Sequence, residues 1–268
     1  MSRTFSHGIE IKKRYGQHFL RSTKIVDSIV DTIDIESASV FEIGCGDGFL
    51  TRAILEKAVK RLWVFEIDPE WVKHVTSTVP DARLTVYEEN ILDIDAQKLA
   101  SHAPWVLLAN LPYQVTFPIL HFLQRNRHLL REGIIMIQEE VAEKILKTSG
   151  RGYGYPSLFF QRYFAWKKLD KVPPTAFEPP PKVMSRLLYF KPQEQVAEIA
   201  HEVEFWKFIK ICFHQPRRTL RNNLLQSHYQ VSALTEQELN LRAQQMSMQD
   251  LIQIWNKLVP FIVVHLAA

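Results

Sequence analysis

An amide, a proline and an aromatic ring stand together in Asn110-Leu111-Pro112-Tyr113, directly after the apolar run 105–109. Such a run is typical of a strand buried on both faces of a parallel sheet. Pro112 lacks a backbone N–H and disfavours helical geometry at Leu111, so we expect an extended turn here. Because ligands of open α/β sheets bind beyond the carboxyl ends of the strands, the motif predicts a site that holds a flat ligand bearing an amino group. The alternative is a capped strand end with an exposed tyrosine.

A glycine-rich turn earlier in the chain predicts a cofactor loop. The segment 39–43 has the pattern of a strand, runs into Gly44-Cys45-Gly46-Asp47-Gly48, and precedes apolar residues at helical spacing over 49–55. Glycines let the backbone approach a ligand closely. Glu66 ends the next expected strand, about 20 residues after Gly44, where an acidic side chain accepts hydrogen bonds from ribose hydroxyls. The pattern indicates a cofactor that contains a nucleoside; the alternative is a tight structural turn.

The spacing of these glycines favours S-adenosylmethionine over a dinucleotide. The usual dinucleotide fingerprint is G-x-G-x-x-G, whereas Gly48 comes one residue early. Asp47 would also bring negative charge towards a pyrophosphate bound at the helix N-terminus. S-adenosylmethionine carries no phosphate, so we expect it as the cofactor, with NAD as the alternative.

Strand and helix patterns alternate from residue 22 to residue 146, which predicts an α/β fold with a doubly wound, mostly parallel sheet. Asn90 follows the third strand, where its side chain is placed to hydrogen-bond the cofactor's adenine. The patterns after Pro192 are helical only, so we expect a catalytic domain over 1–192 and a small all-α domain over 193–268. Strands are expected at 39–43, 62–65, 83–87, 105–109 and 134–137, with a terminal hairpin from 158–166 and 185–190.

Composition and charge suggest a cytoplasmic protein with a nucleic-acid partner; the alternative for the charge is a solvated surface. With 46% hydrophobic and 23% charged residues the chain is typical of a soluble globular protein, and its net charge of +4 is small. Two cysteines are too few for a disulfide framework or a zinc ribbon, and we expect neither a metal site nor a membrane span. Clustered positive charge suggests a phosphate-bearing partner. The clusters are Lys12, Lys13 and Arg14, and Arg217, Arg218 and Arg221.

A proline-rich segment presents a second aromatic ring. Three prolines stiffen Phe177-Glu178-Pro179-Pro180-Pro181-Lys182 and hold Phe177 in a fixed position. Together with Tyr113 it offers two flat surfaces that could sandwich a base. The alternative is that Phe177 is an ordinary core anchor.

The motifs, in this order, resemble the ribosomal RNA adenine N6-dimethyltransferases of the KsgA/RsmA type. The similarity runs from about Lys12 to the C-terminus. The resemblance implies a Rossmann-like class I methyltransferase with a seven-stranded sheet, acting as a monomer on two adjacent adenosines near the 3′ end of small-subunit rRNA within a pre-ribosomal particle. It is carried by Gly16-Gln17-His18-Phe19-Leu20, 42–51, Glu66-Ile67-Asp68, Asn110-Leu111-Pro112-Tyr113 and 177–183.

The resemblance also assigns site residues. Position 18 is commonly Asn in the family and position 90 commonly Asp, but His18 can donate a hydrogen bond and Asn90 can donate and accept. Proline at position 216 is not the usual residue in the family's arginine-rich segment, and we expect Pro216 to break the helix there. The implied cofactor-binding residues are His18, Leu20, Gly44, Gly46, Glu66, Asn90 and Asn110, and the implied catalytic residues are Asn110, Leu111, Pro112, Tyr113 and Phe177.

These residues suit methyl transfer to an adenine amine, whose lone pair is delocalised into the ring. The side-chain oxygen of Asn110 and a main-chain carbonyl of Leu111-Pro112 could accept both N–H groups and turn the lone pair towards the methyl carbon. No strong base is required, because the nitrogen becomes acidic only after transfer. Tyr113 and Phe177 would clamp the extruded base, with stacking worth about 1–3 kcal/mol per base.

Two other functions share much of this pattern. Methyltransferases of the antibiotic-resistance type modify large-subunit rRNA. The segment 212–224 argues against this class, because it resembles the arginine-rich segment of the small-subunit enzymes. A non-catalytic assembly or transcription factor could keep the fold without the activity, and the intact motif from Asn110 to Tyr113 argues against that alternative.

Overall fold

The computed structural model describes residues 5–225 and 227–266, which form two compact units. Within the described residues, the first unit comprises 5–142 and 164–192, and the second comprises 143–163 and 193–266. The chain passes from the first unit to the second between residues 192 and 193. The segment 143–163 lies in the second unit, however, and not with the sheet.

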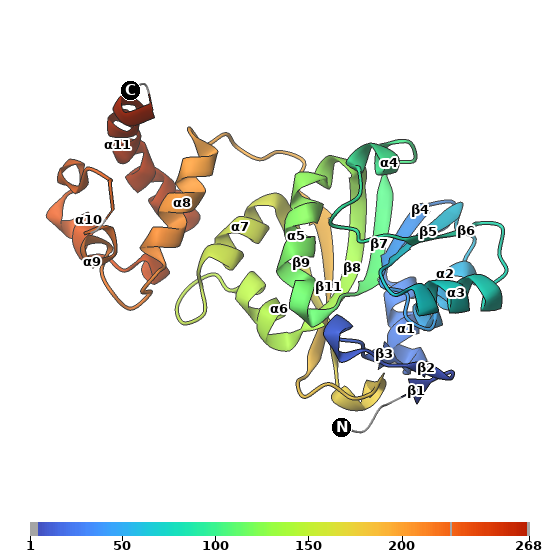
Figure 1. The fold of residues 1–268 in the computed structure, drawn as a ribbon. Helices are drawn as coiled ribbons and strands as arrows, with labels where there is room; N and C mark the ends of the chain where they lie inside the picture. Colours follow the sequence, from blue (N-terminus) through green and yellow to red (C-terminus); the bar gives the residue numbers. More distant parts are fainter. Residues whose placement is uncertain (1–4, 226, 267–268) are drawn as a thin grey trace. The chain divides into compact units, whose positions relative to one another are not determined.

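A seven-stranded sheet forms the centre of the first unit, in the order β6-β5-β4-β7-β8-β11-β9 (Figure 1). Strands β4 to β8 are parallel, and β11 pairs antiparallel with both β8 and β9. This confirms the predicted mostly parallel, doubly wound sheet. The strands are β4 (Ser39–Ile43), β5 (Arg61–Glu66), β6 (Leu84–Glu88), β7 (Trp105–Asn110), β8 (Leu130–Gln138), β9 (Phe164–Val172) and β11 (Ser185–Pro192).

Alternating strand residues build a core on each face of this sheet. On one face Val40, Val64 and Val106 pack with apolar residues of the first two helices. On the other face Trp63 and Trp105 form an aromatic cluster. The helices and short helical turns of this part of the chain are α1 (Thr23–Asp31), α2 (Phe49–Leu55), α3 (Pro69–Thr78), α4 (Ala96–Ala100), η2 (Tyr113–Val115), α5 (Thr116–Arg125), η3 (Arg127–Leu129), α6 (Glu139–Leu146) and η4 (Pro174–Ala176).

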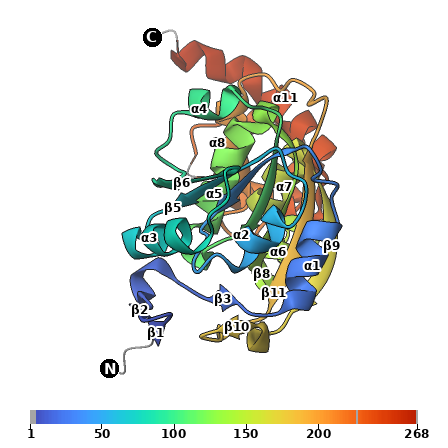
Figure 2. The ribbon, with the colours of Figure 1, turned by 90° about the vertical axis from the view of Figure 1, so that its right-hand side faces the viewer.

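The N-terminal segment is anchored to the proline-rich segment by a short two-stranded sheet. Strand β3 (Phe19–Leu20) pairs antiparallel with β10 (Phe177–Glu178), so that Leu20 lies opposite Phe177 (Figure 2). Before it come a hairpin of β1 (Phe5–Ser6) and β2 (Ile9–Glu10) and the turn η1 (Lys13–Tyr15).

The prediction of a strand over 158–166 is wrong for its first six residues. They belong to α7 (Tyr155–Tyr163), and β9 begins only at Phe164. Leu158, Phe159 and Phe160 are all buried. A short run that is apolar on every side fits a buried helix as well as a buried strand, so its periodicity does not separate the two.

The remaining elements of the second unit are helical, as the pattern after Pro192 predicts. Thr235 and Glu238 form the reciprocal capping box at the start of α10. No helix within 5–225 or 227–266 is long and apolar enough to cross a membrane. Besides α7 the unit contains α8 (Glu202–Cys212), α9 (Leu220–Leu224), η5 (Val231–Ala233), α10 (Glu236–Asn240), η6 (Ala243–Gln245) and α11 (Met248–Leu266).

Candidate active site

A cavity of about 1030 Å³, including its open mouth, lies at the carboxyl ends of β4, β5 and β7. The expected cofactor residues all line it, although they come from segments spread over nearly a hundred positions. The N-terminal segment forms one wall of this cavity, which follows from the pairing of β3 with β10. The predicted residues that line the cavity are His18, Leu20, Gly44, Gly46, Glu66, Asn90, Asn110, Leu111, Pro112 and Tyr113.

The glycine loop owes its shape to backbone conformations and close contacts that side chains would disturb. Gly44, Gly46 and Gly48 all have positive φ angles. A Cβ atom on Gly46 would lie 2.6 Å from the ring of Phe19, so the loop and the N-terminal segment approach as closely as a glycine permits. Gly48 is the N-cap of α2.

Glu66 has the position and the hydrogen-bonding capacity of a ribose acceptor. Its Oε1 accepts from the backbone N–H groups of Ile67 and Asp68 at 2.8 and 2.9 Å, and its Oε2 accepts from Gly46 at 3.3 Å. Burial raises the pKa of the Glu66 carboxyl, and these amide hydrogen bonds oppose that rise. The amides hold the carboxylate at the cavity wall, and its oxygens can accept further hydrogen bonds.

Glu42 is a cavity residue to which the sequence motif assigned no role. Its carboxyl is only 1% exposed and accepts one hydrogen bond, from the hydroxyl of Thr51 at 2.7 Å. Burial raises the pKa of Glu42 to about 8; the Thr51 hydrogen bond lowers it, and the charges of Glu66 and Asp47 raise it. Its place two residues before the first glycine of the loop is the signal that could have identified it.

The motif at the end of β7 is held by both its side chain and its backbone. The Asn110 amide nitrogen donates to the carbonyl of His18 at 3.1 Å, which fixes the plane of the carboxamide and therefore the direction of its oxygen. The carbonyl of Pro112 accepts from Val115 N–H and the Thr116 hydroxyl. It is thus engaged in the following turn, so Leu111 offers the better main-chain acceptor.

Tyr113 presents its ring beside His18, with the ring centroids 5.8 Å apart and the planes 29° apart. The Tyr113 hydroxyl is hydrogen-bonded to Ser185 Oγ at 2.5 Å, and burial raises its pKa. His18 Nδ1 lies 2.8 Å from the carbonyl of Pro179 and must donate to it, because a carbonyl only accepts. Both rings are therefore fixed in orientation.

Phe177 is not part of the cavity wall that the described residues form. Its side chain is 4% exposed and packs in the core beneath the sheet with Leu20, Val172 and Ala176. The structure thus places it as a core anchor, the alternative to a base clamp. Tyr15, which the sequence motif did not single out, lines the cavity.

Asn90 reaches the cavity wall, but its side chain is engaged in a local turn. Its Oδ1 accepts from Leu92 N–H at 3.1 Å and its Nδ2 donates to Asp93 at 2.9 Å. A cofactor that contacts Asn90 would therefore compete with, or add to, these two hydrogen bonds.

The N-terminal basic residues differ in how freely they can meet a phosphate. Lys12 forms ion pairs with Asp68 and Glu70, each at 2.6 Å, so its charge is already balanced. Lys13 begins η1. Arg14 is exposed, with its guanidinium 4.6 Å from the ring centroid of Tyr15.

The three arginines of the second basic cluster lie in two different elements. Helix α8 ends at Cys212, so Pro216 lies in the turn after it and does not interrupt a helix. Arg217 and Arg218 are exposed in the same turn, whereas Arg221 belongs to α9 and is paired with Glu236. Proline at 216 favours this turn because it cannot donate an intrahelical hydrogen bond.

Metal ligation has no support in the described part of the chain. Among its histidine, cysteine, aspartate and glutamate residues, no group of three or more is arranged to hold a metal ion.

Comparison with known proteins places the chain among rRNA-modifying enzymes. A sequence profile of the family described as ribosomal RNA adenine dimethylase matches residues 8–259. A Chlorobium phaeobacteroides protein named ribosomal RNA small subunit methyltransferase A is 33% identical over 257 residues, covering 95% of this chain and 94% of that protein.

Two solved structures share the fold. A dimethyladenosine transferase from Plasmodium falciparum superposes with a TM-score of 0.75 at 24% identity, over 90% of this chain and 98% of that one. The 23S rRNA methyltransferase ErmE gives a TM-score of 0.68 at 20% identity, over 90% and 99% of the two chains. At these identities the two structures support the class I methyltransferase fold only.

Replacing Glu42 with Gln should flatten the pH dependence of stability. Between the ordinary pKa of 4.5 and about 8, the folded carboxyl keeps a proton that the unfolded chain has released, so stability falls as the pH rises. The slope reaches about 1.4 kcal/mol per pH unit. Urea unfolding from about pH 5 to pH 8 measures it, with exposed Glu56→Gln as the control. Equal slopes in the wild type and Glu42→Gln would contradict the assignment.

Proposed function

Because the chain belongs to the ribosomal RNA adenine dimethylase family, we propose that it transfers methyl groups from S-adenosylmethionine to the N6 amines of two adjacent adenosines near the 3′ end of small-subunit rRNA. One observation supports this proposal most strongly. The glycine loop, the buried carboxylate of Glu66 and the Asn110–Tyr113 motif all line the same cavity. The small-subunit name of the relative favours this target over large-subunit rRNA, the target in the name of ErmE.

The residues present fit S-adenosylmethionine. The cradle around Gly46 admits a ligand close to the backbone, and Glu66 would hold the ribose hydroxyls. Glu42 and Asp47 are acidic side chains on the same wall, which suits a cofactor that carries positive charge and no phosphate. When bound, S-adenosylmethionine supplies a methyl group made electrophilic by the sulfonium centre.

Asn110 would orient the target amine. Its amide nitrogen is held by the His18 carbonyl, so its oxygen keeps one direction and can accept an N–H of the adenine amine. The carbonyl of Leu111 would accept the second N–H. Two acceptors hold the nitrogen lone pair towards the methyl carbon, and most of the rate enhancement would come from this orientation. Water would take the proton after transfer.

Tyr113 would supply the stacking surface for the flipped base, since its ring is fixed by the contacts to Ser185 and His18. Because Phe177 is buried, it would act by holding the N-terminal segment in place through the β3–β10 pairing.

The proposed partner is small-subunit rRNA within a pre-ribosomal particle in the cytoplasm, met by a monomer of this chain. The exposed guanidinium groups of Arg14, Arg217 and Arg218 are the cations best placed to contact phosphates. Incubation with a labelled methyl donor and immature small-subunit particles, followed by mapping of the label, tests the proposal. Label on two adjacent adenosines near the 3′ end is expected, and label confined to large-subunit rRNA or absent would refute it.

Asn110→Ala should lower kcat for methyl transfer by at least about 100-fold, because an acceptor that acts in the transition state is lost. RNA affinity should change little. Single-turnover assays measure the step. Asn126→Ala is the matched control, because the Asn126 side chain donates to the Phe122 carbonyl at the C-terminal end of α5 and does not line the cavity. Full turnover in Asn110→Ala would remove the residue from the mechanism.

Glu66→Ala should weaken S-adenosylmethionine binding about tenfold or more, equivalent to about 1.4 kcal/mol. The physical reason is the loss of a preoriented ribose acceptor. Isothermal calorimetry with the purified protein measures it, and Glu56→Ala, on the exposed end of α2, serves as the control. Unchanged affinity would exclude the ribose contact.

Replacing both Arg217 and Arg218 with Ala should reduce the slope of log Kd against log salt for RNA binding by about 1.5, because two phosphate contacts disappear. Arg221→Ala should have a smaller effect, since Glu236 already balances its charge. Filter binding at several salt concentrations measures both. An unaltered slope in the double variant would mean that the two side chains are surface charge only.

A further inference from the structure

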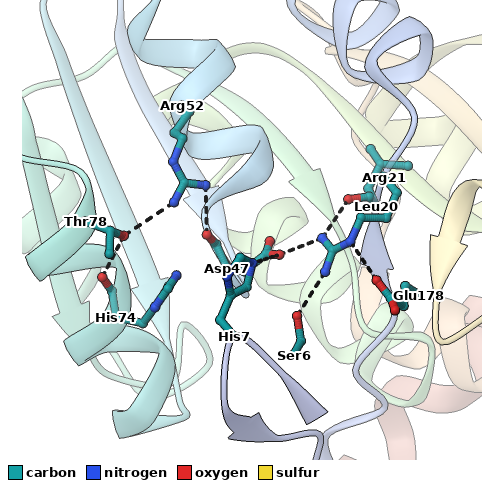
Figure 3. A network of polar contacts seen from close by, with 9 residues as sticks. All are labelled: Ser6, His7, Leu20, Arg21, Asp47, Arg52, His74, Thr78 and Glu178. Atoms are coloured by element: carbon teal, nitrogen blue, oxygen red, sulfur yellow. Dashed lines mark hydrogen bonds and ion pairs between the residues drawn. The ribbon is translucent and has the colours of Figure 1, made fainter. Parts of the chain in front are cut away.

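One guanidinium, that of Arg21, joins three segments of the chain beside the cofactor cavity (Figure 3). Its Nη1 donates to Asp47 Oδ2 at 2.6 Å, its Nη2 to Ser6 Oγ at 3.1 Å and its Nε to Glu178 Oε2 at 3.1 Å. The planar group thus uses each of its three nitrogens on a different segment, which a lysine cannot do. Arg21 has no role in the chemistry described so far.

The first connection leads into the cofactor loop. Asp47 lies between Gly46 and Gly48, is 3% exposed and lines the cavity. Its carboxylate also lies 3.4 Å from His7 Nε2, and its carbonyl accepts from Arg52 at 3.0 Å. A ligand that fixes the loop therefore also fixes the carboxylate that holds Arg21.

The second connection leads into the proline-rich segment. Glu178 lies between Phe177 and Pro179, and the carbonyl of Pro179 accepts from the ring of His18. The backbone N–H of Arg21 also donates to the Ala176 carbonyl at 2.8 Å. Arg21 thus holds this segment by both its side chain and its backbone.

We propose that Arg21 is a positioning residue that couples cofactor binding at the glycine loop to the ordering of segment 176–179 and, through Pro179, of His18 beside Tyr113. The coupling rests on the proposed function, which supplies the cofactor. Its physical basis is that Arg21 hydrogen-bonds both Asp47 and Glu178, so ordering of the glycine loop reduces the conformational freedom of segment 176–179. Cofactor binding would then prepare the side of the site that receives the base.

Hydrogen exchange on the full-length protein, with and without S-adenosylhomocysteine, tests this coupling. In the wild type the ligand should slow exchange over 44–48 and also over 176–179. In Arg21→Met the ligand's slowing of exchange over 44–48 should remain within about threefold of the wild type. Its slowing of exchange over 176–179 should fall at least tenfold. Lys57→Met is the control, because Lys57 forms an ion pair of the same length, 2.6 Å, with the exposed Asp31, and neither residue lines the cavity.

Glu178→Ala covers the case in which Arg21→Met does not fold. The Glu178 side chain is 62% exposed, so its removal leaves the core intact and breaks only the far end of the link. In Glu178→Ala the ligand should still slow exchange over 44–48 but should lose most of its effect over 176–179. The variant should also have a kcat about tenfold lower at unchanged cofactor affinity. A merely structural role would lower stability without separating the two segments.

The outcomes separate the coupling from the proposed function. Slowed exchange at 44–48 without any effect at 176–179 in the wild type would overturn the coupling and leave the cofactor assignment standing. Equal effects at 176–179 in the wild type, Arg21→Met and Glu178→Ala would overturn the role of Arg21. No effect at 44–48 in the wild type would overturn the cofactor assignment, and the coupling with it.

Discussion

Buried negative charge is the constraint around which the site is organised. In the described part of the chain, the aspartate and glutamate residues that are less than 9% exposed are Glu42, Asp47, Glu66 and Asp68. All four lie at the carboxyl ends of β4 and β5 or in the loop between β4 and α2. A buried carboxylate is costly unless it is hydrogen-bonded, paired with a cation or protonated.

These carboxyls are compensated in three ways, and the N-terminal segment supplies Arg21 and Lys12 as cations. Arg21 pairs with Asp47, Lys12 pairs with Asp68, and Gln17 adds a hydrogen bond to Asp68. Glu66 is held by backbone amides, which leaves lone pairs for a ribose. Glu42 accepts a hydrogen bond from the Thr51 hydroxyl, and burial raises its pKa to about 8.

This compensation explains why the N-terminal segment forms a wall of the cavity although it contributes little to the sheet. The pairs to Asp47 and Asp68 hold residues 12–21 against the strand ends, and the β3–β10 pairing holds them from the other side. Once the segment is fixed, the His18 carbonyl is in place to orient Asn110. The orientation of the Asn110 carboxamide therefore depends on ion pairs that hold the N-terminal segment in place.

The amino-acid sequence by itself determined the sheet and the placement of the glycine loop, Glu66 and the Asn110–Tyr113 motif at the ends of its strands. These features depend on local patterns: alternation of elements, glycine spacing and a proline after a buried strand. Only the tertiary structure showed that 158–163 is helical, that Phe177 is buried and that Glu42 lines the cavity. It also showed that Arg217 and Arg218 lie in a turn, whereas Arg221 belongs to α9. An all-apolar run such as Leu158-Phe159-Phe160 has no period to distinguish helix from strand, and a lone aromatic or acidic residue does not reveal what packs against it. Burial and ion pairing arise between residues far apart in the chain, such as Arg21 and Glu178, and local spacing carries no information about them.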